Sequence, residues 1–512
     1  MLRQGGNAVD AAVAAAFTSF IAESALVNIG AGGIAQVIDP SRGQAVVYDF
    51  FSTMPGLGAN GSGPATTLDF REKLVDFGPA QQAFYIGRGS AAVPGAVAGL
   101  CQMVAERGRL PLPTILAPAI RHAREGLIVS PEQAFIASIV RPILIDTPEI
   151  AAIYAPQGQF AQAGQRLYFT ALADTLTRLA EEGSDLFYRG EIAQQIVQDQ
   201  RKNGGLLTHT DLAHYQVLRC APIQIAYRDY TILLPPYASD GGPLLAFTLE
   251  LLSQHALGSQ PHNSPEHLKL LSEAMRLTNV ARAEWETYKM EAPSSNWLLQ
   301  KATVQKYQTL LREILRRGQP LTEPPLPKGP ANTTHLSVAD DQGMVVSLTT
   351  SAGENAGFVV GDSGVMLNNM LGEMDLHPNG FHQLPAGQRL ATMMSPTLVL
   401  HQGQPLLAVG SGGSNRLRSA ILQTISNLID FDLPFEAAVN GPRIHFEENV
   451  IQLEGGIEAE VADQLEDEGY ALKRWPERNM FFGGAHAVLY LEKEKRWSAM
   501  GDARRGGSVV LG

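Results

Sequence analysis

Cysteine is almost absent from this chain of 512 residues, which contains only Cys101 and Cys220. Two cysteines cannot build a disulfide framework, and they cannot supply a four-thiolate zinc site. The 12 histidines show no spacing typical of metal ligands, so we expect no metal and no other cofactor. The chain also lacks any run of about 18 consecutive apolar residues, so no membrane-spanning helix is predicted.

An excess of positive charge is lacking as well. Lysine and arginine number 39, aspartate and glutamate number 51, and the formal net charge is −12. Such a chain cannot neutralise many phosphates, which argues against general nucleic-acid binding. Apolar residues make up 45% of the sequence, and its length allows a large hydrophobic core. We interpret the chain as a globular, mildly acidic enzyme that acts on a small-molecule substrate.

The spacing of apolar residues predicts helices mixed with short strands in the first part of the chain. An alanine-rich segment at 11–20 is predicted as a buried helix rather than a secretory signal, because Asp10 begins it and Glu23 follows it. The compartment stays open. Early strands are predicted at 35–38 and 45–50, and helices at 91–107, 113–126, from 131 onward, 168–180, 190–203, 265–285 and 304–317. The middle of the chain is therefore expected to be mostly helical.

A proline-rich segment separates this part from a strand-rich one. Residues 317–331 contain five prolines and two glycines among 15 residues, which excludes a helix or a central strand and predicts an exposed linker up to residue 332. Strands at 334–339 and 344–350 flank a hairpin turn. More strands are predicted at 365–367, 397–400, 405–409, 450–453, 485–492 and 497–500, with a helix at 415–430. Strands on both sides of the linker predict one layered α/β core.

The junction Asn332-Thr333 is a candidate reactive site. An internal threonine is a poor nucleophile because no base lies in its own residue. If the chain is cut before Thr333, a free α-amine lies beside the hydroxyl of the same residue. This amine titrates near ~7.7–8.0, so a single residue supplies both nucleophile and base. The alternative is an ordinary strand start, where paired threonines are common.

Two further segments could bind polar groups. Residues 409–415 join a strand to a helix through small residues, whose backbone N–H groups could hold an oxyanion, although a tight turn explains them equally well. The segment lacks the lysine of a nucleotide-binding loop. Asn368 and Asn369 are followed by Glu373 and Asp375, which could recognise an ammonium group. The alternative is a loop whose asparagines bind its own backbone. We interpret His335 as a packed strand residue.

Several motifs follow one another along nearly the whole chain. They are GGNAVDAA at 5–12, the glycines after Asn28, GGLLTHTDL at 204–212, TTHLSVADDQGMVVSLT from 333, GDSGVMLNN from 361, MSPT from 394 and GSGGS from 410. This order resembles the γ-glutamyltransferase family of N-terminal nucleophile hydrolases. The resemblance implies a precursor that cuts itself into a large subunit (1–332) and a small subunit (333–512), which pair as a heterodimer. It also implies a four-layer αββα sandwich with one composite core.

The resemblance assigns roles to individual residues. It implies that cleavage falls between Asn332 and Thr333, with Thr333 as the nucleophile, and that Ser351 supplies a second hydroxyl near it. The backbone N–H groups of Gly412 and Gly413 match the oxyanion hole of the family. The residues that match its substrate-binding positions are Asn369, Glu373, Thr392 and Met393, with Glu373 at the position that binds the α-ammonium of the donor.

Two departures concern the carboxylate of the donor. The family has an arginine that binds the donor α-carboxylate, and Phe51 stands at that position. Its Ser-Ser pair is Thr392-Met393 here, so one hydroxyl of two is lost. A guanidinium–carboxylate contact has no apolar substitute. The resemblance implies an enzyme that transfers a γ-glutamyl group, commonly from glutathione, to an amine or water. The alternatives are an acylase whose donor lacks an α-carboxylate and a catalytically silent scaffold.

Overall fold

The computed structural model describes residues 1–58, 67–76, 81–236, 238–291, 297–317, 333–377 and 379–511. These residues form two compact units, the first made of the described residues within 1–220 and 333–390 and the second of those within 221–317 and 391–511. The predicted linker at 318–332, with Asn332 at its end, lies outside the described residues.

The first unit is built on an antiparallel five-stranded sheet in the order β10-β11-β1-β2-β7. Its strands are β1 Gly32–Asp39, β2 Gln44–Phe50, β7 Leu218–Cys220, β10 Thr334–Ala339 and β11 Val345–Ser351. The register of β1 against β11 runs from Gly32 opposite Ser351 to Ile38 opposite Val345. Strands from before and after residue 332 therefore share one sheet.

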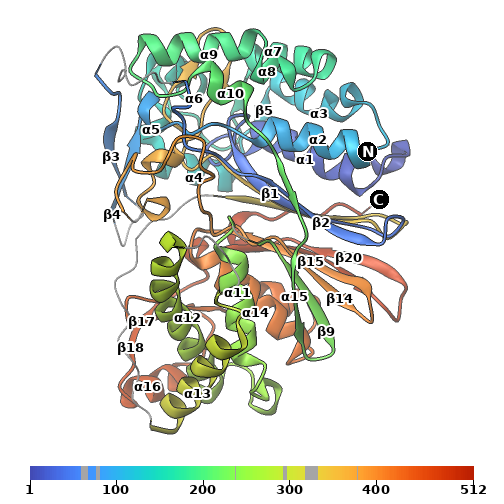
Figure 1. Ribbon diagram of the computed structural model, residues 1–512, viewed down its shortest axis with the longest axis vertical. Coiled ribbons are helices and arrows are strands. Elements are labelled where there is room, and N and C mark those ends of the chain that lie inside the picture. Colours follow the sequence, from blue (N-terminus) through green and yellow to red (C-terminus); the bar gives the residue numbers. More distant parts are fainter. Residues whose placement is uncertain are drawn as a thin grey trace. The chain divides into compact units, whose positions relative to one another are not determined.

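Helices α1 (Ala8–Ala22) and α2 (Ala96–Arg107) pack on this sheet, and Figure 1 shows them lying along it with α3 (Leu112–Glu125) beside them. The first motif of the sequence explains the start of α1. The Asn7 side chain accepts hydrogen bonds from the backbone N–H groups of Val9 and Asp10, while the Asp10 carboxylate accepts one from the Asn7 N–H. This reciprocal cap satisfies N–H groups that the helix itself cannot pair.

A second motif residue joins α1 to the strand hairpin. Asp340, in the turn between β10 and β11, accepts hydrogen bonds from the Gln342 and Met344 N–H groups, each 2.9 Å long. Its other oxygen accepts one from the Ala8 N–H, also 2.9 Å long. The aspartate of the TTHLSVAD run thus closes the hairpin and stabilises the positive end of the helix dipole.

The first unit contains further helices and short strands besides this sheet and the helices α1 to α3. The helices are α4 Pro131–Ile139, α5 Arg141–Leu144, α6 Pro148–Tyr154, α7 Thr170–Glu182, α8 Asp185–Tyr188, α9 Glu191–Lys202 and α10 His209–Ala213. The remaining strands form three pairs, β3 Arg71–Asp76 with β4 Gln81–Ile86, β5 Leu127–Ile128 with β6 Arg166–Leu167, and β12 Val359–Val360 with β13 Val365–Met366.

The second unit is built on a six-stranded antiparallel sheet in the order β20-β19-β15-β14-β9-β8. Its strands are β8 Ile223–Tyr227, β9 Tyr230–Leu234, β14 Thr397–His401, β15 Gln404–Gly412, β19 Gly484–Leu491 and β20 Arg496–Met500. A smaller sheet pairs β16 Ile444–Glu447, β17 Val450–Leu453 and β18 Ala471–Arg474.

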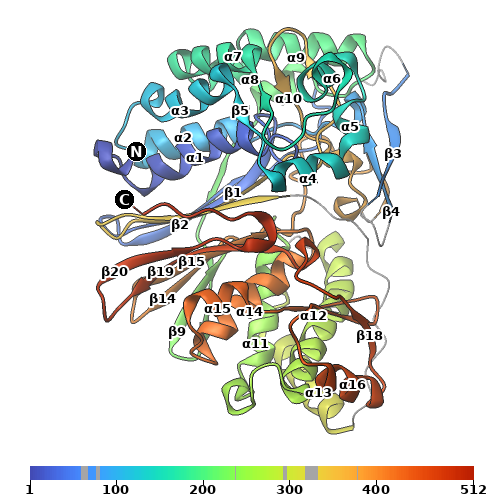
Figure 2. The same cartoon turned by 180° about the vertical axis from the view of Figure 1, so that it is seen from behind.

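Helices pack against the six-stranded sheet, as Figure 2 shows for α11 and α14. The helices of this unit are α11 Gly241–Leu252, α12 Pro265–Glu291, α13 Lys301–Arg317, α14 Arg416–Ile429, α15 Phe435–Asn440 and α16 Ala459–Asp467. Phe247, Trp285 and Tyr307 are fully buried in the hydrophobic cluster between them. Among the described residues, no helix combines the length and the apolar character needed to cross a bilayer.

A buried ionic network ties the last residues of the chain to the second unit. Asp502 lies 2.8 Å from Arg443 and 3.1 Å from Arg504, and Arg504 also lies 2.5 Å from Glu454. Burial alone would raise the pKa of Asp502, but Arg443 and Arg504 outweigh it and hold the pKa at about 2, below the ordinary 3.8. A carboxyl group with a depressed pKa stabilises the fold above its ordinary pKa, and this stabilisation is lost as the pH falls toward the depressed value.

The substitution Asp502→Asn is expected to lower the free energy of unfolding by about 3–5 kcal/mol, because it leaves Arg443 buried without its charge partner. Chemical denaturation followed by circular dichroism measures the change. The substitution should also remove the part of the pH dependence of the unfolding free energy that Asp502 causes between pH 3.8 and about 2. The control is Asp463→Asn, because Asp463 pairs with Arg474 but its side chain is 65% exposed, so its loss should cost at most about 1 kcal/mol. Equal effects of the two substitutions would contradict this account.

The predicted α/β class is confirmed, and most predicted elements are present. The alanine-rich segment is α1, and the two strands predicted after the linker are β10 and β11. The expectation of a mostly helical middle is wrong where β7, β8 and β9 occupy residues 218–234. These strands have three to five residues each, which is too short for a clear periodic pattern, and they are stabilised by pairing with distant strands. The four-layer sandwich implied by the resemblance needs two helix-backed sheets, and each unit contains one.

Candidate functional site

Thr333 lies directly before β10 at the end of the five-stranded sheet. The register pairs Thr334 with Thr350, so Thr333 and Ser351 each adjoin one member of the first pair of this ladder. Ser351 in turn pairs with Gly32 on β1. The two hydroxyl residues predicted to act together thus lie at the same end of the β10–β11 pair, and Thr333 is only 4% exposed.

The residues after Thr333 are tied to the sheet and to α1. The Thr334 hydroxyl donates a hydrogen bond to Glu23, which follows the end of α1. His335 is buried, with Nδ1 2.8 Å from the Thr349 hydroxyl and Nε2 2.9 Å from the Ser337 hydroxyl. The interpretation of His335 as a packed strand residue is confirmed.

Ser351, Asn369 and Glu373 meet around Gly353. The Gly353 N–H donates to the Ser351 hydroxyl over 2.9 Å, and the Glu354 N–H donates to the Asn369 side-chain oxygen over 2.9 Å. A Cβ on residue 353 would lie 2.0 Å from that Asn369 oxygen and 2.1 Å from Oε1 of Glu373. Residue 353 also has φ +67, so only glycine fits this position. The structure thus brings three predicted site residues together.

Asn368 has a structural role beside this cluster. Its Nδ2 donates to the backbone oxygens of Gly30 and Ala92, over 2.7 and 3.1 Å. Its Oδ1 accepts from the N–H groups of Ala92 and Met370, over 3.0 and 3.1 Å. For this asparagine the loop-ordering alternative is correct. It fixes the loop on which Asn369 and Glu373 lie.

Glu373 has unusual electrostatics for a carboxyl group. It is only 3% exposed, and neither of its oxygens has a hydrogen-bond partner among the described residues. Burial raises the pKa of Glu373 well above its ordinary 4.5, and the nearby carboxyl groups of Glu354 and Asp375 raise it further. A cation placed beside Glu373 would reverse this effect by favouring the ionised form. The group is therefore suited to a positively charged ligand.

The position of the missing arginine is occupied by a buried Phe51, which is 1% exposed. A cation does lie near its backbone. Arg389 donates to the Phe51 carbonyl oxygen and, over 2.6 Å each, to the Tyr215 hydroxyl and the Gln216 carbonyl oxygen. Its Nε lies 3.7 Å from Asp49. The guanidinium is thus committed to groups of the protein. The sequence did not indicate a role for Arg389, because this arginine belongs to none of the motifs. It contacts Phe51 only because the folded chain brings the two residues together.

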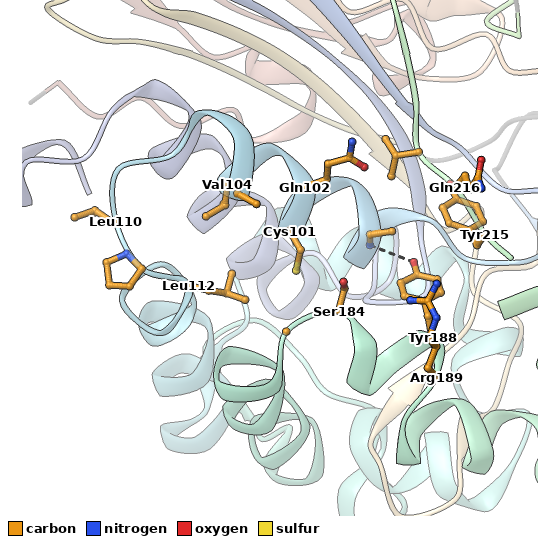
Figure 3. A pocket seen from close by; sticks show the side chains of 15 residues that line it. Cys101, Gln102, Val104, Leu110, Leu112, Ser184, Tyr188, Arg189, Tyr215 and Gln216 are labelled. Atoms are coloured by element: carbon orange, nitrogen blue, oxygen red, sulfur yellow. Dashed lines mark hydrogen bonds between the residues drawn. The ribbon is translucent and has the colours of Figure 1, made fainter. Parts of the chain in front are cut away.

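A cavity of about 710 Å³ lies behind this network in the first unit. Figure 3 shows Tyr188, Tyr215 and Cys101 on its wall, with the Tyr188 hydroxyl bonded to the backbone N–H of Ala98. Burial raises the pKa of Cys101 to about 12, so its thiol is not an activated nucleophile. None of the predicted site residues lines this cavity.

The other predicted residues belong to the second unit. The backbone oxygen of Thr392 accepts hydrogen bonds from the N–H groups of Asp240 and Gly241, over 2.8 and 3.1 Å, and Met393 follows it. Gly412 ends β15 and Gly413 has φ +121, a conformation that favours glycine. Helix α14 begins three residues later at Arg416. The strand–turn–helix predicted here is confirmed.

Comparisons with known proteins converge on one family. The family model described as gamma-glutamyltranspeptidase matches residues 1–512. The Acylase ACY 1 proenzyme of Pseudomonas sp. strain SE83 is 33% identical over 499 residues, covering 96% of this chain and 87% of that protein. The glutathione hydrolase proenzyme of Escherichia coli K12 is 30% identical over 493 residues, covering 92% of this chain and 82% of that protein. The cephalosporin acylase from Bacillus halodurans has a similar crystal structure, with a TM-score of 0.79 at 26% identity, covering 99% of this chain and 92% of that one.

Proposed function

The chain belongs to the γ-glutamyltranspeptidase family, and from that premise we propose that it becomes active by cutting its own bond between Asn332 and Thr333. It is an N-terminal nucleophile amidohydrolase of this family, and its relatives among the acylases and glutathione hydrolases are proenzymes. The cleavage makes Thr333 the first residue of a small subunit, 333–512, and leaves 1–332 as the large subunit.

The position of Thr333 is the observation that carries this proposal. It is buried directly before β10, whose first residue Thr334 pairs with Thr350, the neighbour of Ser351, so the sheet holds the backbone next to its hydroxyl. In the precursor, that hydroxyl attacks the carbonyl carbon of Asn332, and the C–N bond breaks as the ester forms, which frees the α-amine. Water then hydrolyses the ester, which restores the hydroxyl and separates the two chains. Because β10 and β11 pair with each other and β11 pairs with β1, the two products share one sheet, which supports a heterodimer that stays associated.

In the mature enzyme, Thr333 supplies both nucleophile and base. Its Oγ forms a bond to the amide carbonyl carbon of the donor, and its α-amine takes the hydroxyl proton and passes it to the leaving amine as the C–N bond breaks. We assign the stabilisation of the oxyanion to the N–H groups of Gly412 and Gly413. One such donor typically contributes about 3–4 kcal/mol to the transition state. Water or an acceptor amine then attacks the ester and restores Thr333.

The residues around Gly353 are assigned to donor binding. Glu373 supplies an acidic group, Asn369 orders its loop, and Thr392 and Met393 match the donor-binding pair of the family. Acylase activity on a donor without an α-carboxylate is the second candidate, favoured by Phe51 and by the commitment of Arg389 to the Tyr215 hydroxyl and backbone oxygens. A γ-glutamyl donor and such an acyl donor share the same covalent chemistry at Thr333.

Acid-quenched mass spectrometry tests the shared mechanism. Purified, processed protein is mixed with acyl p-nitroanilides and quenched within the first turnovers. The proposal expects the mass of the acyl group on the product 333–512, none on the product 1–332, and release of nitroaniline. A processed protein that neither carries an acyl group nor releases nitroaniline from any donor would instead be the catalytically silent scaffold.

The substitution Ser351→Ala is expected to lower kcat/KM about tenfold. The Gly353 N–H loses its acceptor, and one buried hydrogen bond is worth about 0.5–1.5 kcal/mol. Steady-state release of nitroaniline measures the change. The control is Ser347→Ala, which removes another buried hydroxyl from the same strand without touching Gly353. If both variants keep the original kcat/KM, Ser351 has no role in positioning the site.

A further inference from the structure

The donor site of the first unit has a carboxyl group prepared for a cation. Glu373 is buried without a hydrogen-bond partner among the described residues, and its Oε1 would be 2.1 Å from a Cβ on residue 353. The absence of that Cβ therefore lets the Glu373 carboxyl group pack directly against the backbone of Gly353. The Gly353 N–H donates to the hydroxyl of Ser351, which ends β11, the strand that pairs with β10 directly after Thr333. Gly353 thus connects the Glu373 carboxyl group to Ser351, the last residue of the strand that pairs with β10, and a cation beside Glu373 would favour its ionised form.

The described basic residue near Phe51, Arg389, is bound to groups of the protein. Phe51 stands where the family has an arginine. The Arg389 guanidinium donates hydrogen bonds to the Phe51 carbonyl oxygen, the Tyr215 hydroxyl and the Gln216 carbonyl oxygen. Its remaining nitrogen faces Asp49. Both terminal nitrogens of Arg389 thus donate to protein acceptors, and its Nε faces a carboxylate of the protein, so the guanidinium is held away from a bidentate contact with a ligand.

The basic residues of the neighbouring elements are likewise paired. Strand β4 packs against the segment Met370–Gly372 that precedes Glu373. On its partner strand β3, Arg71 and Lys73 each lie 2.7 Å from Asp146. Arg88, in the turn that also packs on this segment, lies 3.2 Å from Asp199. Arg71, Lys73 and Arg88 thus pair with protein carboxylates, so none of these three described basic residues is committed to a ligand carboxylate beside Glu373.

We propose that the preferred donor is an ω-aminoacyl amide, which carries a primary ammonium at the end of the acyl chain and no carboxylate. The 4-aminobutyryl group is the simplest example, because it is the γ-glutamyl group without its α-carboxylate and keeps the same distance from carbonyl to nitrogen. The inference rests on the proposed function of Thr333. A donor carboxylate would be desolvated here without a partner, which is costly, whereas an ammonium pairs with Glu373.

The reaction balances without any further reactant. The Thr333 Oγ–carbonyl bond forms, the C–N bond to the leaving amine breaks, and the hydroxyl proton moves through the α-amine to that leaving group. Water then cleaves the ester, which releases the free ω-amino acid and restores the hydroxyl. The ammonium bound at Glu373 takes no part in bond making, so Glu373 acts on binding and orientation only.

Four p-nitroanilides that differ only in their end groups test the inference. They are γ-glutamyl (ammonium and carboxylate), 4-aminobutyryl (ammonium only), glutaryl (carboxylate only) and butyryl (neither). The processed enzyme is expected to give the highest kcat/KM with 4-aminobutyryl, at least tenfold above each of the others. A higher value for glutaryl or γ-glutamyl, or equal values for butyryl and 4-aminobutyryl, would overturn the inference while the proposed function stands. Cleavage of none of the four would overturn both.

The variant Glu373→Gln tests whether this carboxyl group is responsible for the preference for a donor with a terminal ammonium group. Glutamine has the shape of the protonated carboxyl group that burial favours in the empty site, so the variant should fold, and intact mass confirms its processing. The ratio of kcat/KM for 4-aminobutyryl to butyryl should fall at least tenfold. The control Glu182→Gln makes the same change in the exposed ion pair with Arg178 and should keep the ratio. An unchanged ratio in Glu373→Gln would overturn the assignment of the ammonium to Glu373.

Discussion

Replacing Thr333 with alanine is expected to leave a single chain of 512 residues and to reduce turnover below detection. The substitution removes the hydroxyl that attacks the Asn332 carbonyl, so no α-amine is released and neither nucleophile nor base exists. Intact mass after prolonged incubation measures processing, and nitroaniline release measures turnover. The loss of turnover should be the largest of any single substitution in the chain.

The variant Thr333→Ser is the matched control for this prediction. Serine keeps the hydroxyl and, after cleavage, the α-amine, so both processing and turnover should persist at reduced rates. The buried position at the head of β10 is the same for both variants, so a general loss of folding would affect them alike. A Thr333→Ala chain that is still cut at residue 332 would show that another protease processes the precursor.

The substitution Gly413→Ala is expected to lower kcat by about 10²–10³, the usual effect of losing one oxyanion donor. Gly413 has φ +121, and an added Cβ would lie 3.0 Å from the Cα of Gly483. The backbone must therefore rotate to accept alanine, which turns the N–H groups of this turn away from their position. Single-turnover kinetics on the processed protein separates this effect on the chemical step from any effect on cleavage.

Gly403→Ala is the control for backbone strain. Gly403 also has a positive φ, +80, and lies in the turn between β14 and β15 with no atom within 4 Å of its added Cβ. The strain of a left-handed alanine, about 1–2 kcal/mol, should appear in both variants as a similar loss of stability. If Gly413→Ala lowers stability but leaves kcat within twofold of the original, the oxyanion role of this turn is wrong.

Local patterns predicted the elements around the nucleophile well. The alternation of β10 and β11 and the turn at Asp340 are visible in the sequence, and the structure extends them by no more than one residue. The glycine-rich segment before α14 likewise gives its strand–turn–helix form without any long-range information. These features depend on neighbours in sequence, which is why motif and periodicity were sufficient.

The electrostatics of the donor site could not be predicted in the same way. The raised pKa of Glu373 comes from burial and from Glu354 and Asp375 together, which only the folded loop produces. Arg389 reaches Phe51 from 338 positions away along the chain, and no residue spacing signals that contact. The short strands β7 to β9 were missed for a similar reason, since distant partners stabilise them.

N-terminal sequencing of the small chain in catalytically active protein tests the central claim most directly. The account predicts one new N-terminus that reads Thr-Thr-His-Leu-Ser, beginning at Thr333, in an amount equal to that of the large chain. Active protein in which Thr333 is still joined to Asn332, or in which the small chain begins at any other residue, would contradict it.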